Sequence, residues 1–207
     1  MLRWIGSDRG RVVSTHSLAR AFAAVIVAVL AALTPASAQV FCEPLPGTAI
    51  FCPCFNFPSG PGRGCDNSAA TGGAALTAAG NPSISNDTLV ITVTGVGNTS
   101  SSCVNPTGNV PSVLIQGDVV VAGTAFFDGV RCVGGNLKRI ETAFTVSGVF
   151  TSTVGISTTS ASLGDPLSAG FVRYYFLYYR DPCPTFACTG TFDTANASNA
   201  YQITWTP

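Results

Sequence analysis

The sequence predicts an all-β, disulfide-supported β-sandwich of Greek-key or jelly-roll type, preceded by a cleaved signal peptide. Three observations predict it. Short runs of strand-forming residues alternate with turn residues, no segment after the leader keeps helical periodicity for three turns, and all eight cysteines follow the leader. We assign residues 1–38 to the signal peptide, 39–73 to a Cys/Pro/Gly-rich lead-in and 74–207 to the sandwich domain.

The leader is a basic segment followed by an apolar run. Four arginines precede or border the uncharged residues 21–33, and the run ends near the small residues Ala36, Ser37 and Ala38. This pattern is typical of a secretory signal peptide, cleaved here after Ala38. The run is shorter than the roughly 20 residues that a membrane-spanning helix needs, and no comparable run follows it. We therefore expect a secreted or cell-surface protein with no membrane span.

Charge and histidine content disfavour several classes of partner and of catalytic site. The chain after residue 38 has six basic and nine acidic residues, a net charge of −3, which disfavours nucleic acid as a partner. Its one histidine, His16, lies in the leader. The mature chain therefore has no imidazole for a Ser-His-Asp or Cys-His arrangement or for a His-ligated zinc.

The cysteines are even in number and follow an export signal, so we expect disulfides rather than metal ligands. A zinc site is the alternative, but the chain has no CxxC pair. Local spacing favours pairing Cys54 with Cys65 and Cys183 with Cys188. The full set of disulfide candidates is Cys42, Cys52, Cys54, Cys65, Cys103, Cys132, Cys183 and Cys188.

Strands are expected wherever apolar residues alternate with polar ones. Leu89, Ile91 and Val93 alternate with threonines and predict a strand with one wet face. Residues 201–205 show the clearest period of two and predict a closing strand. Further strands are expected at residues 112–116, 119–121, 137–146 and 149–156, and a long loop at 99–111.

The segment 171–180 (FVRYYFLYYR) is apolar on both faces and contains four of the five tyrosines. The favoured interpretation is a central strand covered on both sides. The alternative is an aromatic platform that stacks sugar rings, flanked by Arg173 and Arg180. In that case the ligand-binding residues would be Tyr175, Tyr179 and Trp205.

No catalytic, cofactor or metal site is recognisable. The chain has neither a GxSxG elbow nor a glycine-rich phosphate loop. Its carboxylates are scattered and often sit beside Gly or Pro, as in Asp128-Gly129 and Asp181-Pro182, which favours turn geometry. A histidine-free glycosidase with two facing carboxylates stays open. A calcium site built from loop carboxylates is a lesser alternative.

Several motifs occur in a specific order: FFDGVRCVGG, then RYYFLYYRDP, then the terminal TWTP. In this respect residues 52–207 resemble an uncharacterised family of bacterial secreted β-rich modules with the signature DG-x-RC-x-GG, RYY…YRDP and TWTP. The resemblance implies a secreted module with no assigned activity. The chain departs from the family in its loops around Cys103 and Cys183, and at Phe127, where a glycine often precedes the DG pair.

These observations together predict a secreted, non-catalytic structural or interaction module with an unknown extracellular partner. The alternative is a carbohydrate-binding module that uses the aromatic strand face and takes a polysaccharide. No cofactor, metal, nucleic acid or membrane span is expected.

Overall fold

The computed structural model describes residues 38–97, 109–181 and 195–207. Residues 1–37 of the predicted signal peptide, three cysteines (Cys103, Cys183 and Cys188) and most of the predicted loop 99–111 lie outside the described residues, whereas Ala38 is described as the first residue of a strand. The described segments belong to one compact unit that includes the Cys/Pro/Gly-rich lead-in. Their regular elements are antiparallel strands and one short helix, so the all-β prediction is confirmed.

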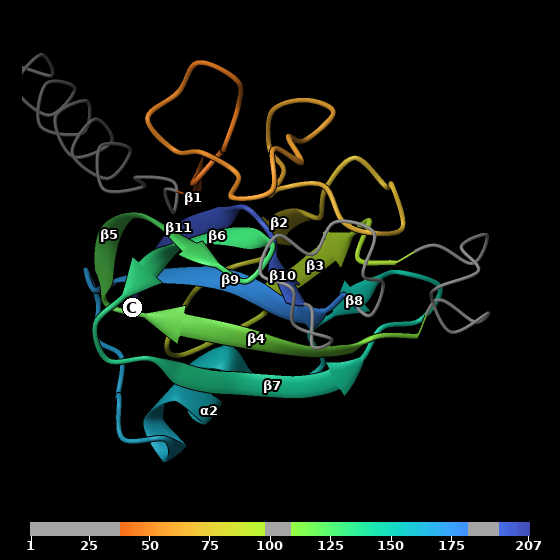
Figure 1. Cartoon of the computed structure of the whole chain (residues 1–207). Coiled ribbons are helices and arrows are strands. Elements are labelled where there is room, and N and C mark those ends of the chain that lie inside the picture. Colours follow the sequence, from red (N-terminus) through yellow and green to blue (C-terminus); the bar gives the residue numbers. More distant parts are fainter. Residues whose placement is uncertain (1–37, 98–108, 182–194) are drawn as a thin grey trace, which may run out of the picture. The chain divides into compact units, whose positions relative to one another are not determined.

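The largest sheet has six strands and β9 in its middle (Figure 1). Its order is β1-β11-β9-β4-β7, and β10 also pairs with β9. The strands are β1 (Ala38–Phe41), β4 (Pro111–Gly117), β7 (Lys138–Phe144), β9 (Val172–Arg180), β10 (Ala195–Ala197) and β11 (Ala200–Thr204).

The other elements lie on the two faces of this sheet. A three-stranded sheet in the order β2-β3-β8 packs on the inner face, and the β5-β6 hairpin lies on the outer face. These elements are β2 (Ala75–Ala79), β3 (Val90–Thr94), β8 (Phe150–Thr151), β5 (Val119–Phe126), β6 (Gly129–Gly134) and the helix α2 (Ile156–Ser162).

The strand connections cross between the sheets. β7 pairs with β4, the chain crosses to β8 in the smaller sheet, and it returns as β9 on the other side of β4. This return brings residues far apart in the sequence into one ladder, with Val113 opposite Tyr178.

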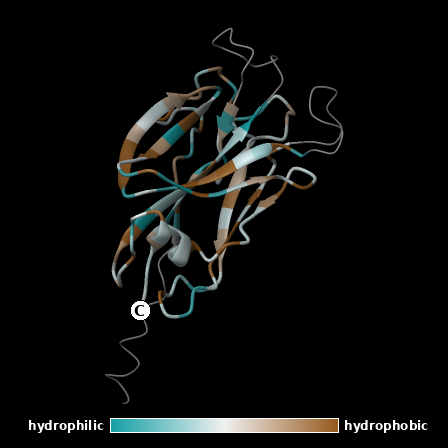
Figure 2. Ribbon diagram, turned by 90° about the horizontal axis from the view of Figure 1, so that it is seen from below, coloured by the Kyte–Doolittle hydropathy of each residue, from teal (hydrophilic) through white to brown (hydrophobic). Residues whose placement is uncertain are grey.

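The main core lies between the six-stranded and the three-stranded sheets. Ile91 and Val93 of β3 are fully buried, whereas Val90, the first residue of the strand, is 38% exposed, which confirms the predicted one-sided strand. From the larger sheet, Leu114, Leu177 and other inner-face residues join the same apolar cluster. Along the strand ribbons, hydrophobic and hydrophilic residues alternate, as expected when each strand has two different faces (Figure 2).

A second, smaller core covers the outer face of β9. Phe176 packs there against Val130 and Val133 of β6 and against the cysteines of the lead-in. Two disulfides hold this layer together: Cys42–Cys132 ties the lead-in to β6, and Cys52–Cys65 closes a loop of the lead-in. Both faces of β9 are therefore covered along much of its length, as the favoured interpretation of residues 171–180 predicts.

The predicted Cys54–Cys65 pair is wrong, because Cys65 bonds to Cys52 with their Cα atoms 5.7 Å apart. Cys54 is also disulfide-bonded. Two cysteines separated by one proline offer a partner almost the same loop length, so spacing alone does not distinguish them. Which of the two cysteines can bond to Cys65 depends on the distance and orientation of the side chains in the folded chain.

The predicted strand over 149–156 is too long. The strand β8 ends at Thr151, and Ile156 is the first residue of α2 rather than a strand residue. The reason lies far away in the sequence, since the Asp87 carboxylate accepts a hydrogen bond of 2.8 Å from the backbone N–H of Ser157. This carboxylate stabilises the first turn of the helix, whose backbone N–H groups have no partner within the helix.

Candidate functional site

The three residues predicted to bind a ligand lie on the inner side of the six-stranded sheet. Tyr175 and Tyr179 are 0% exposed and Trp205 is 1% exposed. All three belong to the main core. A sugar ring cannot stack on side chains that are already covered, so the predicted aromatic platform does not exist in this structure.

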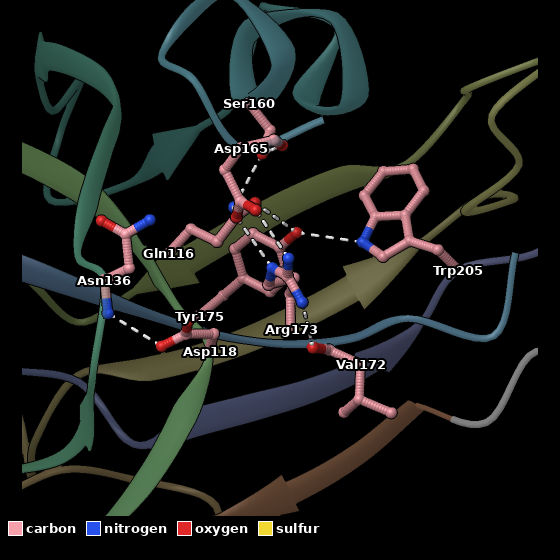
Figure 3. A network of polar contacts seen from close by, with 9 residues as sticks. All are labelled: Gln116, Asp118, Asn136, Ser160, Asp165, Val172, Arg173, Tyr175 and Trp205. Carbon is pink, nitrogen blue, oxygen red and sulfur yellow. Dashed lines mark hydrogen bonds and ion pairs between the residues drawn. The ribbon is translucent and has the colours of Figure 1, made fainter. Parts of the chain in front are cut away.

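Tyr175 and Trp205 take part in a buried polar network (Figure 3). The Trp205 indole N–H donates to the Tyr175 hydroxyl at 3.2 Å, and that hydroxyl donates to Oε1 of Gln116 at 2.8 Å. The Gln116 Nε2 group donates in turn to Ser160 of α2 and to Asp165. Burial raises the pKa of Tyr175, so its hydroxyl stays protonated. The network satisfies the polar atoms that the aromatic core brings inside.

The same network ends in an ion pair at its outer side. Arg173 donates from Nε to Oδ2 of Asp165 at 2.8 Å and from Nη2 to Oδ1 at 2.6 Å. This two-point contact with Arg173 lowers the pKa of Asp165. Arg173 is thus held by a carboxylate and is not a ligand donor beside an open platform. The network joins the segment after α2 to β4 and β9, and its role is structural.

A second polar cluster surrounds the other end of β9. The Asn67 amide donates to the Tyr179 hydroxyl at 3.3 Å, and the backbone N–H and the hydroxyl of Ser68 both donate to Asp181. Asp181 is 3% exposed. Burial raises the pKa of this carboxyl, and the hydrogen bonds from Ser68 only partly offset the effect.

The opposite pKa shifts of Asp181 and Asp165 predict opposite pH dependences. A carboxyl with a raised folded-state pKa loses stabilising effect as pH rises above its unfolded value of about 4. Relative to wild type, Asp181→Asn should therefore gain free energy of unfolding between pH 4 and pH 7, as measured by urea denaturation. Asp165→Asn should show the reverse trend, with its deficit shrinking as pH falls below about 4. A pH-independent difference for Asp181→Asn would contradict this assignment.

The remaining carboxylates have structural partners or lie apart from one another. Glu141 accepts hydrogen bonds from the backbone N–H and the hydroxyl of Thr153. Asp118 accepts one from the backbone N–H of Asn136. Within the described ranges, no three His, Cys, Asp or Glu side chains come together to hold a metal ion. The described residues therefore contain no group of three such side chains that would form the calcium site considered as a lesser alternative.

An open cleft lies on the outer face of the six-stranded sheet, beside the β5-β6 hairpin. We call it the hairpin cleft, and its volume is about 450 Å³. This volume falls within the roughly 300–1,000 Å³ range of small-molecule sites. The described residues that line it are Val113, Ile115, Phe126, Phe127, Arg139 and Tyr178.

The strand register positions the floor and walls of the cleft. Val113 of β4 is paired with Tyr178 of β9, and Ile115 of β4 is paired with Arg139 of β7. A register shift after Leu114 accompanies this arrangement. The aliphatic side chains of β4 thus lie between a tyrosine ring on one side and a guanidinium group on the other.

The hairpin supplies the aromatic wall. The Phe126 ring lies 5.7 Å from the Tyr178 ring, and the Phe127 ring lies 6.2 Å from it. Phe127 is 44% exposed and has a φ of 55°. A side chain with a Cβ atom in this left-handed conformation costs about 1–2 kcal/mol, and glycine adopts it without that cost. Phe127 is the first of the two residues that connect β5 to β6, where a tight hairpin turn calls for a positive φ. The part of its ring that does not contact Phe126 or Tyr178 is open to solvent at the cleft.

Arg139 is the charged group among the described residues that line the cleft. It is exposed, and no described residue forms a hydrogen bond or an ion pair with it. The ion pair among the described residues joins Arg173 and Asp165. A second guanidinium, that of Arg131, lies 5.6 Å from the centroid of the Phe126 ring. Asp128, which follows Phe127, is 1% exposed and does not line the cleft.

The cleft is lined by the aromatic strand that the sequence singles out, but by its other face. Tyr178 lines the cleft, whereas the predicted ligand-binding residues Tyr175 and Tyr179 are buried on the inner face. The FFDG segment was interpreted as a turn, and no local signal places its rings over β9. The one usable signal is Phe127 itself, a bulky residue next to an Asp-Gly turn.

Comparisons with known proteins add no relative. A scan of family models found no match, and searches among curated proteins and among solved structures found none either. In the part of the chain that the structure describes, no helix has the length and apolar character needed to cross a membrane.

Proposed function

We propose that this chain is a secreted, non-catalytic binding module whose ligand occupies the hairpin cleft. The observation that carries the proposal is the partly exposed Phe127 ring, which lines the cleft together with Tyr178 and Arg139. Among the described residues, the cleft combines aromatic and aliphatic walls with a cation that no described carboxylate pairs, which is the usual composition of a small-ligand site.

The structural framework supports an extracellular setting for this module. Two disulfides hold the lead-in against the hairpin and close the lead-in loop, and such bonds persist in oxidising compartments. The resemblance to bacterial secreted modules points the same way. In this proposal the ligand is a carbohydrate, because the CH-rich face of a sugar ring complements the negative face of an aromatic ring.

Phe127→Gly tests the proposal with little risk of unfolding. Glycine relieves the left-handed backbone while removing the exposed ring, so we expect the free energy of unfolding to change by no more than about 1 kcal/mol. Affinity electrophoresis through polygalacturonate, methyl-esterified pectin, xylan and soluble cellulose should show retardation of wild type in at least one gel. Phe127→Gly should migrate as if no polysaccharide were present.

Phe55→Gly is the matched control. Phe55 has a φ of 57° and is 75% exposed, but it lies in the lead-in and is not among the residues lining the cleft. It should keep the wild-type retardation. Equal loss in both variants, or unretarded wild type in every gel, would overturn the proposed function.

A further inference from the structure

The hairpin cleft has a single sign of charge, and this feature bears on its ligand. Arg139 contributes a guanidinium at one wall, and the guanidinium of Arg131, which does not itself line the cleft, lies over the Phe126 ring. The Arg131 Nε atom is buried and has no hydrogen-bond partner within the described residues. No carboxylate is among the described residues that line the cleft, although the chain after the leader carries an excess of acidic residues.

The distances in the sheet define what a ligand must span. β7 and β9 flank β4, so Arg139 and Tyr178 are about 10 Å apart across the sheet, and they are offset by two residues, about 7 Å, along β4. One sugar ring lying against the exposed surfaces of Tyr178 and Phe127 would extend its substituent over Val113 and Ile115 toward Arg139. A carboxylate at that end would meet the planar fork of Arg139, which suits two-point contact with such a group.

A peptide is a poorer fit to this cleft. The floor is the face of β4, whose backbone pairs with β7 on one side and β9 on the other. Extended peptides are commonly bound by main-chain hydrogen bonds to a free sheet edge, and a paired central strand offers no such edge. The floor of the cleft offers exposed aromatic rings but no unpaired strand edge. This combination favours a saccharide over an extended peptide.

From these observations we infer that the hairpin cleft binds an acidic saccharide, with the sugar ring against Tyr178 and Phe127 and its carboxylate on Arg139. This inference rests on the proposed function and makes it more specific, because a cleft that binds neutral sugars equally well would still satisfy the proposal above.

Isothermal titration with a homogeneous oligogalacturonide and with its fully methyl-esterified form tests the inference. We expect the acid to bind at least about tenfold more tightly than the ester, since a charge-assisted contact is lost in the ester. Arg139→Gln should weaken binding of the acid about tenfold or more and leave binding of the ester unchanged.

Lys138→Gln is the matched control for charge. Lys138 is the preceding residue of the same strand, and it is paired with Gln116, whose side chain enters the inner network. This variant removes the same charge from the other face of the sheet and should bind the acid as wild type does.

The possible results distinguish a wrong ligand class from the absence of any binding function. Equal affinity for acid and ester, with both lost in Phe127→Gly, would overturn the acidic ligand and leave the binding function intact. Binding of a poly-glutamate peptide in place of both sugars, dependent on Arg139, would overturn the saccharide. Absence of binding to all three probes, together with no retardation in the polysaccharide gels, would overturn the inference and the proposed function together.

Discussion

Replacing Tyr179 by alanine should destabilise the protein by about 3–5 kcal/mol, the usual range when a large buried aromatic side chain is removed. Tyr179 is fully buried in the core between the sheets, and its hydroxyl accepts a hydrogen bond from Asn67. For a chain of this size, each kcal/mol lowers the melting temperature by roughly 2–4 °C. We therefore expect thermal denaturation to show a melting temperature lower by about 6–20 °C.

Tyr178→Ala is the control on the neighbouring position of the same strand. Its ring is only partly buried and faces the hairpin cleft, so the loss of stability should be less than half as large. The same variant should bind the oligogalacturonide more weakly. If Tyr179→Ala instead kept wild-type stability and lost saccharide binding, the inner face of β9 would be the ligand surface and our assignment would be wrong.

Removing the Cys42–Cys132 disulfide should have the second large effect. The bond joins residues separated by 90 positions and holds the lead-in on β6. A cross-link over a loop of this length lowers the entropy of the unfolded chain and stabilises the fold by about 4–5 kcal/mol. The Cys42→Ala/Cys132→Ala double variant should lose most of this stabilisation in urea denaturation of oxidised protein.

The Cys52→Ala/Cys65→Ala double variant provides the comparison. Its sequence separation is 13, for which the same relation gives about 3 kcal/mol. We expect the long-range pair to cost more than the short-range pair. An equal or smaller loss for Cys42 and Cys132 would mean that the lead-in docks on β6 without help from the bond.

The sequence predicted those parts of the fold that depend on local periodicity. Ile91 and Val93 face the core as their alternation with threonine indicates, and the closing strand contains Ile203, which is buried as expected. Residues 171–180 form a central strand because both of their faces are apolar. In each case the pattern of side chains within one segment is sufficient to determine which face is buried.

The remaining features depend on contacts between distant segments. The α2 helix starts at Ile156 where Asp87 accepts a hydrogen bond from its first turn, and a window around residue 156 contains no sign of that carboxylate. The candidate site has the same origin. Phe127 comes to lie near Tyr178, 51 positions later in the chain, only because the β5-β6 hairpin folds over the outer face of the sheet.

The central claim is that the ligand surface lies on the outer face of β9, in the hairpin cleft. Titration of isotope-labelled protein with the oligogalacturonide, followed by NMR of aromatic and arginine side chains, tests it most directly. We predict that the largest shift changes occur at Phe127, Tyr178 and Arg139, with Tyr175, Tyr179 and Trp205 nearly unaffected. Changes centred on the latter three side chains, or on the exposed Phe55 of the lead-in, would contradict the claim.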